Sequence, residues 1–328
     1  VPSNAELTDL ASDITDIQTV VQGIVSIPQG RLTLTSATPF ITSDVTAGTS
    51  VYYTPYIGSL APIWDGTQYV MRTFAELTLS LASQHTASNL YDVFLFWNSG
   101  AVEIVTGPAW SNSTAGSCSR GTGAGSTELE RKNGLWTNKN SITGRNGATT
   151  YTIDAYKALF IGTILIDGTN GQISQHVTVG QSRKPGPSNV YSRIRRTIIS
   201  ADPTSSWSYG TAAFRVSRND ATNGIPVINC LPEEEVSITF QQTIIIDANK
   251  SGAIGIGVNS TSVSSGVLGR ASQGNVAGQN SNTTIAAAHR SLAADGLNIY
   301  HPLEYGHASG LALYGTSNDM RFCVEWMA

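Results

Sequence analysis

The stretch YDVFLFWNSGAVEIV, residues 91–105, indicates the fold class of the chain. Residues 91–98 and 102–105 are short runs rich in apolar, aromatic and β-branched residues, which are typical of strands. The dipeptide Ser99-Gly100 between them favours a turn. A strand, a turn and a second strand therefore follow one another, as they do in antiparallel β-structure.

Similar runs recur along most of the chain, and the further expected strands are residues 31–35, 51–57, 61–66, 151–153, 159–166, 236–240, 243–246 and 322–326. Turn dipeptides punctuate them: Asp65-Gly66, Asn133-Gly134, Asn146-Gly147, Asp167-Gly168 and Asn223-Gly224. Many short strands with turns between them favour an antiparallel sandwich or barrel. Two short helices are expected at residues 74–81 and 286–293, and exposed polar loops at residues 111–126 and 260–284.

Composition narrows the class of protein. The chain has 328 residues, a formal net charge of −4 and three cysteines. The mild acidity argues against a nucleic-acid binder, the cysteines are too few for a disulfide scaffold, and no apolar run is long enough to span a membrane. The first residues lack the basic start and apolar stretch of a secretory signal. Only 13% of residues are charged, which suits either a protein packed among copies of itself or a secreted β-protein.

The first thirty residues differ from the rest. Apolar residues recur in alternating steps of three and four, a heptad pattern formed by Leu7, Leu10, Ile14, Ile17, Val21 and Ile24. Ser3 and Glu6 have the spacing of a capping box, and Pro28 and Gly30 are expected to end the helix after about seven turns. Isoleucine at both core positions favours three or more strands over a parallel dimer. The alternative is a lone amphipathic helix that folds against its own domain.

These patterns give the expected domain organisation. Residues 1–30 form a helical coiled-coil segment for oligomerisation, and residues 31–200 form an antiparallel β-sandwich or jelly-roll-like domain. Residues 201–328 form a second β-rich region with a long polar loop. The boundary is placed there because Pro203 and polar residues follow the last basic strand.

Several short motifs, taken in order, resemble those of tailed-bacteriophage fibre, head-decoration and tail-tip proteins: RLTLTS from residue 31, YYTPYIG from 52, IWDG from 63, FAELTLSLA from 74, YDVF from 91, LFIGTI from 159 and SWSY from 206. The resemblance covers residues 31–240 and contains no catalytic signature. It implies a virion protein whose N-terminal helix attaches to the particle while the β-rich end projects as a trimer. The heptads of residues 7–24 agree with that plan independently.

The sequence offers few groups for catalysis or metal binding. It contains no nucleophile elbow, HExxH pair, Walker loop or dinucleotide fingerprint, and its five histidines lack metal-ligand spacing. No catalytic residue, metal or cofactor is therefore expected. A carboxylate pair for glycoside cleavage is the alternative, drawn from Asp65, Glu76, Asp92, Glu103, Asp154 and Asp167.

Two features are candidates for ligand or subunit contact. Arg193 and Arg195 belong to the one basic concentration of the sequence, and on a strand they would share a face with Tyr191. That face suits an anionic glycan or an acidic neighbour, although an intersubunit salt-bridge patch is the more ordinary interpretation. Trp136, in the polar stretch NGLWTNKN, is the best candidate for an exposed aromatic that stacks on a sugar.

The expected function is therefore structural: a homotrimeric fibre or decoration protein on the exterior of a virion, made in the host cytoplasm. Its expected partners are capsid, collar or tail proteins and host cell-surface polysaccharide, with no nucleic acid and no membrane insertion. The alternatives are a tailspike-type polysaccharide depolymerase and a capsid cement protein without a host-binding role.

Overall fold

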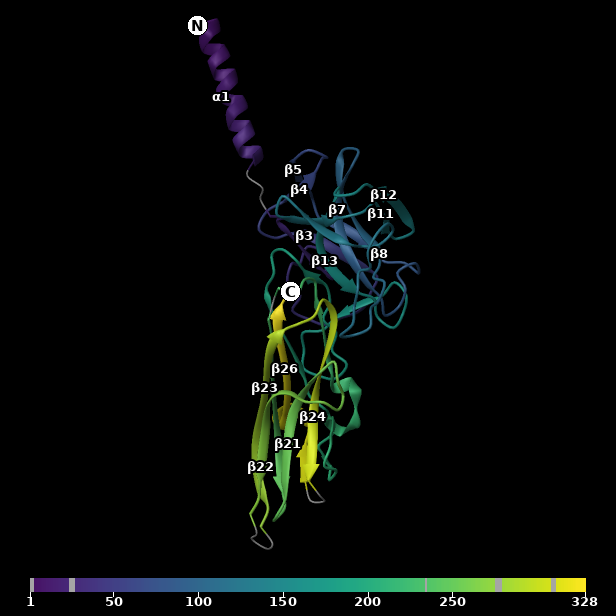
Figure 1. Ribbon diagram of the computed structural model, residues 1–328, viewed down its shortest axis with the longest axis vertical. Helices are drawn as coiled ribbons and strands as arrows, with labels where there is room; N and C mark the ends of the chain where they lie inside the picture. Colours follow the sequence, from purple (N-terminus) through teal and green to yellow (C-terminus); the bar gives the residue numbers. More distant parts are fainter. Residues whose placement is uncertain (1–2, 24–26, 234, 275–278, 308–310) are drawn as a thin grey trace.

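The computed structural model describes residues 3–23, 27–233, 235–274, 279–307 and 311–328. The chain is mainly β, with 53% of residues in strands and 7% in helices, and its sheets are antiparallel. The predicted mainly β class is therefore confirmed. Figure 1 shows an elongated molecule in which a helix, one β module and a second β module follow one another.

The N-terminal module, defined by strands β1–β15, contains two packed sheets. The smaller sheet has the order β1-β3-β6, with β1 (Gly30–Thr33), β3 (Ser50–Pro55) and β6 (Leu77–Ser80). The larger has the order β12-β11-β8-β7-β13-β10-β9, and β15 also pairs with β13. Its strands are β7 (Leu90–Asn98), β8 (Ala101–Ala109), β9 (Leu129–Lys132), β10 (Leu135–Asn138), β11 (Ile142–Asn146), β12 (Thr149–Ile153), β13 (Ala158–Leu165) and β15 (Ser188–Asn189). Two-stranded ribbons complete the module: β2 (Val45–Gly48) with β14 (Ile173–Gln175), and β4 (Leu60–Trp64) with β5 (Tyr69–Thr73).

Strand β7 lies at the centre of this module because apolar side chains cover both of its faces. Successive side chains of a strand point to opposite sides. Val93 and Leu95 belong to the core that also contains Val51 of the smaller sheet. Phe94 and Phe96 belong to a second core on the opposite side of the larger sheet. A strand that is buried on both faces needs a nearly continuous apolar run, as residues 93–96 provide.

The C-terminal module, defined by strands β16–β26, is one long antiparallel path with the order β16-β26-β20-β23-β22-β21-β24-β18. One layer of the module contains β20, β23 and β26, and the other contains β21 and β24. Strand β22 pairs with both β21 and β23 and so joins the two layers at one edge. Side chains from both layers, including Phe240, Phe322, Ile256 and Tyr300, share one core. The strands are β16 (Arg195–Ser200), β17 (Ser206–Ser208), β18 (Phe214–Val216), β19 (Ile225–Asn229), β20 (Glu235–Ile246), β21 (Ser251–Val258), β22 (Ser265–Ser272), β23 (Ser281–Leu292), β24 (Gly296–His307), β25 (Leu311–Tyr314) and β26 (Met320–Met327). Short helical turns occur at Ser217–Asn219, Ala221–Asn223 and Thr316–Asp319.

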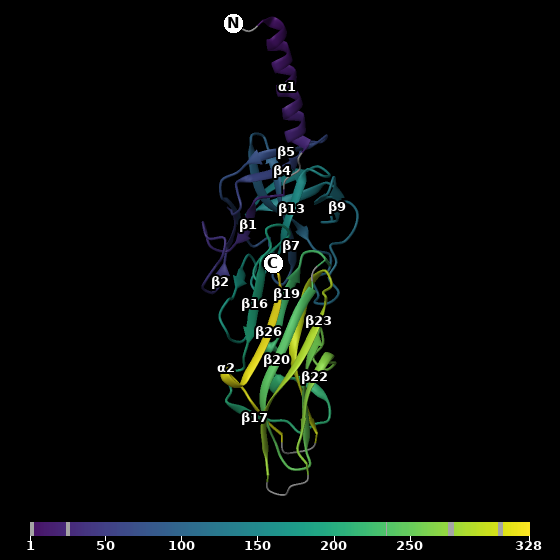
Figure 2. The ribbon, with the colours of Figure 1, turned by 90° about the vertical axis from the view of Figure 1, so that its left-hand side faces the viewer.

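The N-terminal helix α1 spans Asn4–Gly23 and extends beyond the β modules in both ribbon views, Figure 1 and Figure 2. The predicted capping box is confirmed, because the Ser3 hydroxyl accepts a hydrogen bond from the Glu6 amide at 3.3 Å and the Ser3 amide donates to the Glu6 carboxylate at 2.7 Å. The Ser3 amide and the Ser3 hydroxyl both donate to the Glu6 carboxylate, and these two hydrogen bonds lower the pKa of Glu6. The helix ends earlier than Pro28. The structure describes a single copy of α1, so a coiled coil between copies of this helix stays a prediction.

Two expected helices are wrong. Residues 74–81 contain strand β6, which pairs with β3 so that Leu79 lies opposite Val51. Residues 286–293 lie almost entirely in β23, which pairs with β20 over its full length. Neighbouring strands supplied hydrogen-bond partners for both segments, and this outweighed the helix propensity of their alanines and leucines. The expected polar loop at 260–284 likewise contains β22 and the start of β23.

The two modules meet through an apolar cluster and through Arg120, which pairs with Asp295 of the C-terminal module at 3.3 Å. Leu90 and Trp110 of the N-terminal module pack with Ile228 of the C-terminal module. Arg120 donates to the buried Asp92 at 2.7 Å and to the backbone oxygen of Cys230 at 2.7 Å. Strand β16 pairs with β26 and so belongs to the C-terminal module in the described strand pairings. The expected boundary between the two domains, at residue 200, stays a prediction.

Candidate functional site

The expected oligomerisation seam lies on α1. Leu7 and Leu10 are described in full and are 49% and 55% exposed. The backbone of Ile14, Ile17 and Val21 continues the helix, but their side chains and all of Ile24 lie outside the described residues. Leu7 and Leu10 are therefore not buried against the β modules, and their apolar side chains are available to a partner.

Trp136 is half-buried, in contrast to the exposed aromatic that the sequence predicts. It lies on β10, packs against the outer core of the N-terminal module, and has a buried indole nitrogen without a hydrogen-bond partner. The guanidinium carbon of Arg131 lies 4.5 Å from the centroid of the Trp136 ring. The backbone amide of Trp136 donates to the Tyr191 hydroxyl at 3.3 Å. Burial raises the pKa of Tyr191. Trp136 and Tyr191 are thus brought together, as parts of one packed edge.

The expected basic face does not form as a continuous strand. Tyr191 and Arg193 precede β16, and only Arg195 belongs to it. Arg195 is exposed and forms an ion pair with Glu325 of the adjacent strand β26. Because this partner belongs to the same chain, the arginine already has the contact that a neighbouring subunit was expected to provide.

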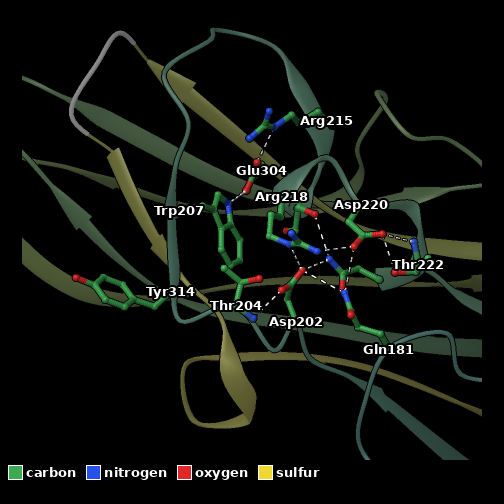
Figure 3. Close-up of polar contacts among 12 residues, drawn as sticks. Gln181, Asp202, Thr204, Trp207, Arg215, Arg218, Asp220, Thr222, Glu304 and Tyr314 are labelled. Carbon is green, nitrogen blue, oxygen red and sulfur yellow. Dashed lines mark hydrogen bonds and ion pairs between the residues drawn. The ribbon is translucent and has the colours of Figure 1, made fainter.

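A carboxylate cluster consists of Asp202, Arg218, Asp220 and Asn223 of the C-terminal module and Gln181 from the segment between β14 and β15 of the N-terminal module. Figure 3 shows Arg218 between the two aspartates, with Nε–O and Nη2–O distances of 2.7 Å and 2.6 Å. Asp202 is fully buried and also accepts from the Asn223 amide at 2.9 Å. Burial alone would raise the pKa of Asp202, but hydrogen bonds from Asn223, Thr204 and Arg218 together lower it.

Glu304 is a second buried carboxylate in the same view (Figure 3). One of its oxygens accepts from the indole of Trp207 at 2.6 Å and the other from Arg215 at 2.7 Å. Burial raises the pKa of Glu304 more than these donors lower it. Each oxygen of Asp202 and Glu304 accepts at least one hydrogen bond, so both carboxylates serve as anchors for loops and strands.

Two of the carboxylates singled out from the sequence hold local structure together. Asp65 caps its turn through Thr67 and Gln68, and Glu76 accepts from Ser36, Ala37 and Thr54. Within the described ranges, no group of three or more His, Cys, Asp and Glu side chains is placed to hold a metal ion. No helix of the described part of the chain has the length and apolarity needed to cross a membrane.

Sequence reasoning missed an arginine pocket, defined by Arg31, Phe40, Val177, Arg195 and Arg196. It has a volume of 190 Å³ and lies where β1 meets β16, between the two modules. Arg31 is only 4% exposed and Arg196 only 7% exposed. The signal was available, because strand alternation places Arg196 on the face opposite Arg195 and therefore towards the interior.

Comparisons with known proteins do not identify the chain. No protein-family model matches it, and no curated protein matches it. Among solved structures it is similar to a tryptic-core variant of the Bacillus thuringiensis Cry1Da protein, with 9% identity, a TM-score of 0.21, and coverage of 92% of this chain. It spans 52% of that protein's length. A structure of infectious bursal disease virus, strain Gx, matches at 10% identity and a TM-score of 0.18, covering 92% of this chain and 76% of the viral one. Neither similarity is large enough to carry an argument about fold or function.

Proposed function

We propose that the chain is a non-enzymatic structural protein of a bacteriophage virion, a homotrimeric fibre or decoration protein exposed on the particle. In this proposal α1 forms a parallel coiled coil that attaches to head, collar or tail proteins. The two β modules project outward, the first as an antiparallel sandwich or jelly roll, and contact host surface glycans. The motif order of residues 31–240 supports membership of the virion.

The observation that carries the proposal is the exposed apolar face of α1. Leu7 and Leu10 lie about one helical turn apart and expose about half of their surface. The charged residues in the sequence of α1 are Glu6, Asp9, Asp13 and Asp16, all of them acidic, so interhelical salt bridges do not select the partner. A helix with these properties gains most of its stability by burying its apolar face against identical helices.

The absence of an enzymatic role rests on the saturated carboxylates. General acid–base chemistry needs a carboxyl group that can reach a substrate proton. Asp202 and Glu304 instead hold protein donors on both oxygens. Contact with a glycan would be weak at one site, and three copies on one trimer would strengthen it through avidity.

Sedimentation of the full chain tests the oligomer. We expect a mass three times the 34.7 kDa of one chain. The double variant Leu7→Ser, Leu10→Ser should sediment as a monomer, because it removes the apolar contacts of the seam. The matched control Thr8→Ala, Ser12→Ala changes exposed positions outside the seam and should remain trimeric. A monomeric full-length chain at micromolar concentration would remove the oligomer from the proposal.

Antibody labelling of imaged phage particles tests the location. We expect label on the outer surface, with the β modules farther from the particle than α1. Purified protein incubated with host capsule or lipopolysaccharide should release no new reducing ends. Release of reducing ends would establish the depolymerase instead. Particles that lack the protein should adsorb poorly to the host, whereas normal adsorption with easier bursting would establish a cement protein.

A further inference from the structure

The arginine pocket contains two buried positive charges from different modules. Arg31 comes from β1 and Arg196 from β16, and both line the same 190 Å³ hollow. Arg195 stands at the same pocket but is exposed and paired with Glu325. No aspartate or glutamate is among the residues described as lining the hollow.

Both buried guanidinium groups are held by backbone oxygens. Arg31 donates to the backbone oxygens of Ser192 at 2.5 Å and Ala328 at 2.7 Å, and its Nε is buried without a hydrogen-bond partner. Arg196 donates to the backbone oxygen of Pro185 and lies over the ring of Trp326, with its guanidinium carbon 5.3 Å from the ring centroid. Over the described ranges, no aspartate or glutamate forms an ion pair with either arginine.

Burial without a counter-charge is unfavourable for a guanidinium. Burial lowers the pKa of Arg31 to about 10 and that of Arg196 to about 9, and the charge of Arg31 adds to the effect on Arg196. Arginine nevertheless keeps its proton at neutral pH. The direction of these shifts therefore reflects the cost of keeping two like charges together away from water.

We propose that the arginine pocket binds an oxyanion group, a carboxylate or a phosphate carried by a small molecule or a sugar residue. A planar guanidinium matches the two oxygens of such a group, and two of them supply a net charge of the opposite sign. The Nε of Arg31 is buried without a hydrogen-bond partner, so the protein leaves part of this guanidinium unsatisfied.

The wall of the pocket defines the rest of the ligand. Phe40 lines the pocket beside Arg31, whose guanidinium carbon lies 5.5 Å from the Phe40 ring centroid. Phe40 and Val177 are both more than a third exposed, at 39% and 38%. An anion attached to a ring with an apolar face would place its charge on the arginines and its ring against Phe40. A uronic acid residue and a sugar phosphate both have this form.

This site is independent of the proposed role in a virion, because it rests on two side chains and their missing counter-charge. An oligomer, a particle or a host surface is not required for the pocket to bind. Failure of the trimer in sedimentation therefore leaves the site intact, and failure of anion binding leaves the trimer intact.

Titration of the full chain with sodium glucuronate and with sodium phosphate tests the site. We expect both anions to raise the thermal midpoint of unfolding in chloride buffer of matched ionic strength, because each binds the folded state. Glucose, which lacks the carboxylate, should leave the midpoint unchanged. A larger rise with glucuronate assigns a sugar acid, and a larger rise with phosphate assigns a phosphate group. No rise with either anion overturns the proposal.

Arg196→Met separates binding from a structural role. If the arginine serves a ligand, the variant should melt at or above the midpoint of the parent chain without anion, and it should bind glucuronate and phosphate about tenfold more weakly or worse. The control Arg290→Met removes the same charge from an exposed pair with Glu235 and should bind as the parent does. A lower midpoint for Arg196→Met together with unchanged anion binding would show a structural arginine and overturn the proposal. Should Arg196→Met fail to fold, Arg196→Lys keeps the charge but loses the planar fork, and it should also bind more weakly.

A chain extended by two glycines after Ala328 provides the remaining control. The backbone oxygen of Ala328 already accepts from Arg31, so a free carboxylate at this residue would supply an internal anion. The extended chain should bind glucuronate and phosphate as the parent chain does. Binding by the extended chain alone would identify the terminal carboxylate as the natural occupant and overturn the proposal.

Discussion

Two sites at the junction of the modules hold buried arginines under opposite conditions. Arg120 lies on a loop of the N-terminal module and meets the fully buried Asp92 through two hydrogen bonds. Burial alone would lower the pKa of Arg120, but the charges of Asp92 and Asp295 and the hydrogen bond to Asp92 together raise it. Arg31 and Arg196 are 4% and 7% exposed, against 11% for the Arg120 side chain, and their pKa values are lowered to about 10 and about 9. The same side chain is stabilised as a cation at one site and penalised at the other.

The network of Asp92, Arg120, Thr127 and Thr163 is a joint whose charges are paired inside the protein, whereas the arginine pocket is an open site. Asp92 also accepts from Thr127 at 2.9 Å and Thr163 at 2.7 Å, so its charge is completely surrounded by donors of the chain itself. Arg120 also pairs with Asp295 of the C-terminal module at 3.3 Å, so the network joins the two modules. The arginine pocket has donors and charge without an acceptor of matching charge, which is the arrangement expected of a site that an outside anion completes.

Replacing the arginine by methionine at each of the two sites should give the largest difference in the free energy of unfolding. Arg120→Met leaves the Asp92 carboxylate buried without its cation and should reduce the free energy of unfolding by about 3–5 kcal/mol. Arg196→Met removes an unpaired cation and should change it by less than about 1 kcal/mol in chloride buffer. Urea unfolding of both variants beside the parent chain measures the difference. Equal losses at the two sites would abolish the distinction between a joint and an open site.

Local turn chemistry was the part of the fold that sequence could predict. Asn133 and Gly134 adopt φ angles of 45° and 94° between β9 and β10, a left-handed pair that Asn-Gly favours in tight hairpins. Ser99-Gly100 joins β7 to β8 in the same way, with φ angles of 45° and 123°. Such turns depend on the two residues themselves. The strand at Ser281–Leu292 depends instead on pairing with β20, a partner about forty residues earlier, so its alanines misled the local prediction.

The candidate sites were predicted unevenly for a similar reason. The capping box and the exposed leucines of α1 follow from spacing alone. Arg196 could have been found from strand alternation, since Arg195 faces outward beside it. Arg120 could not, because it lies in a loop of Gly, Ser and Thr that resembles an exposed segment. Its burial results from docking against the second module, which no local pattern records.

The carboxylate cluster extends the comparison to a second site at which opposite charges of the chain are paired. Asp202→Asn removes the charge that faces Arg218 and should reduce the free energy of unfolding at pH 7 by about 2–3 kcal/mol. The pKa of Asp202 is lowered in the folded chain. Its contribution is therefore complete above the ordinary value of 3.8 and is lost as the pH falls through the folded value.

Denaturant unfolding of the parent chain and Asp202→Asn at a series of pH values measures this dependence. The difference between the two chains should be constant from pH 7 to about pH 5 and should shrink below about pH 4. Carboxylates outside the cluster, such as Asp44, whose pKa is also lowered, titrate equally in both chains and cancel in the difference. A difference that persists unchanged to the lowest pH would show that the charge of Asp202 is not what stabilises the cluster.

A smaller change should weaken the Asp92 joint without leaving a charge unpaired. Thr163→Val keeps the shape of the side chain but removes the hydroxyl that donates to Asp92 at 2.7 Å. Asp92 keeps Arg120 and Thr127, so the loss should be about 1.5 kcal/mol, the size of one hydrogen bond to a charged group. Thermal unfolding beside Arg120→Met ranks the two contributions. A loss as large as that of Arg120→Met would assign the stability to the hydrogen-bond network as a whole, with no separate share for the ion pair.

The smallest effect is expected at the rim of the arginine pocket. Arg195 and Glu325 form an exposed pair whose side chains are 69% and 30% accessible. Solvent and salt screen such a pair, so Arg195→Met should change the free energy of unfolding by less than about 0.5 kcal/mol, and 0.5 M salt should remove even that. Because Arg195 stands at the same pocket as Arg196, this variant separates position in the pocket from burial. If Arg195→Met stabilised the chain as much as Arg196→Met did, general repulsion among the basic residues would explain both effects. Burial of the Arg196 charge would then not be the cause.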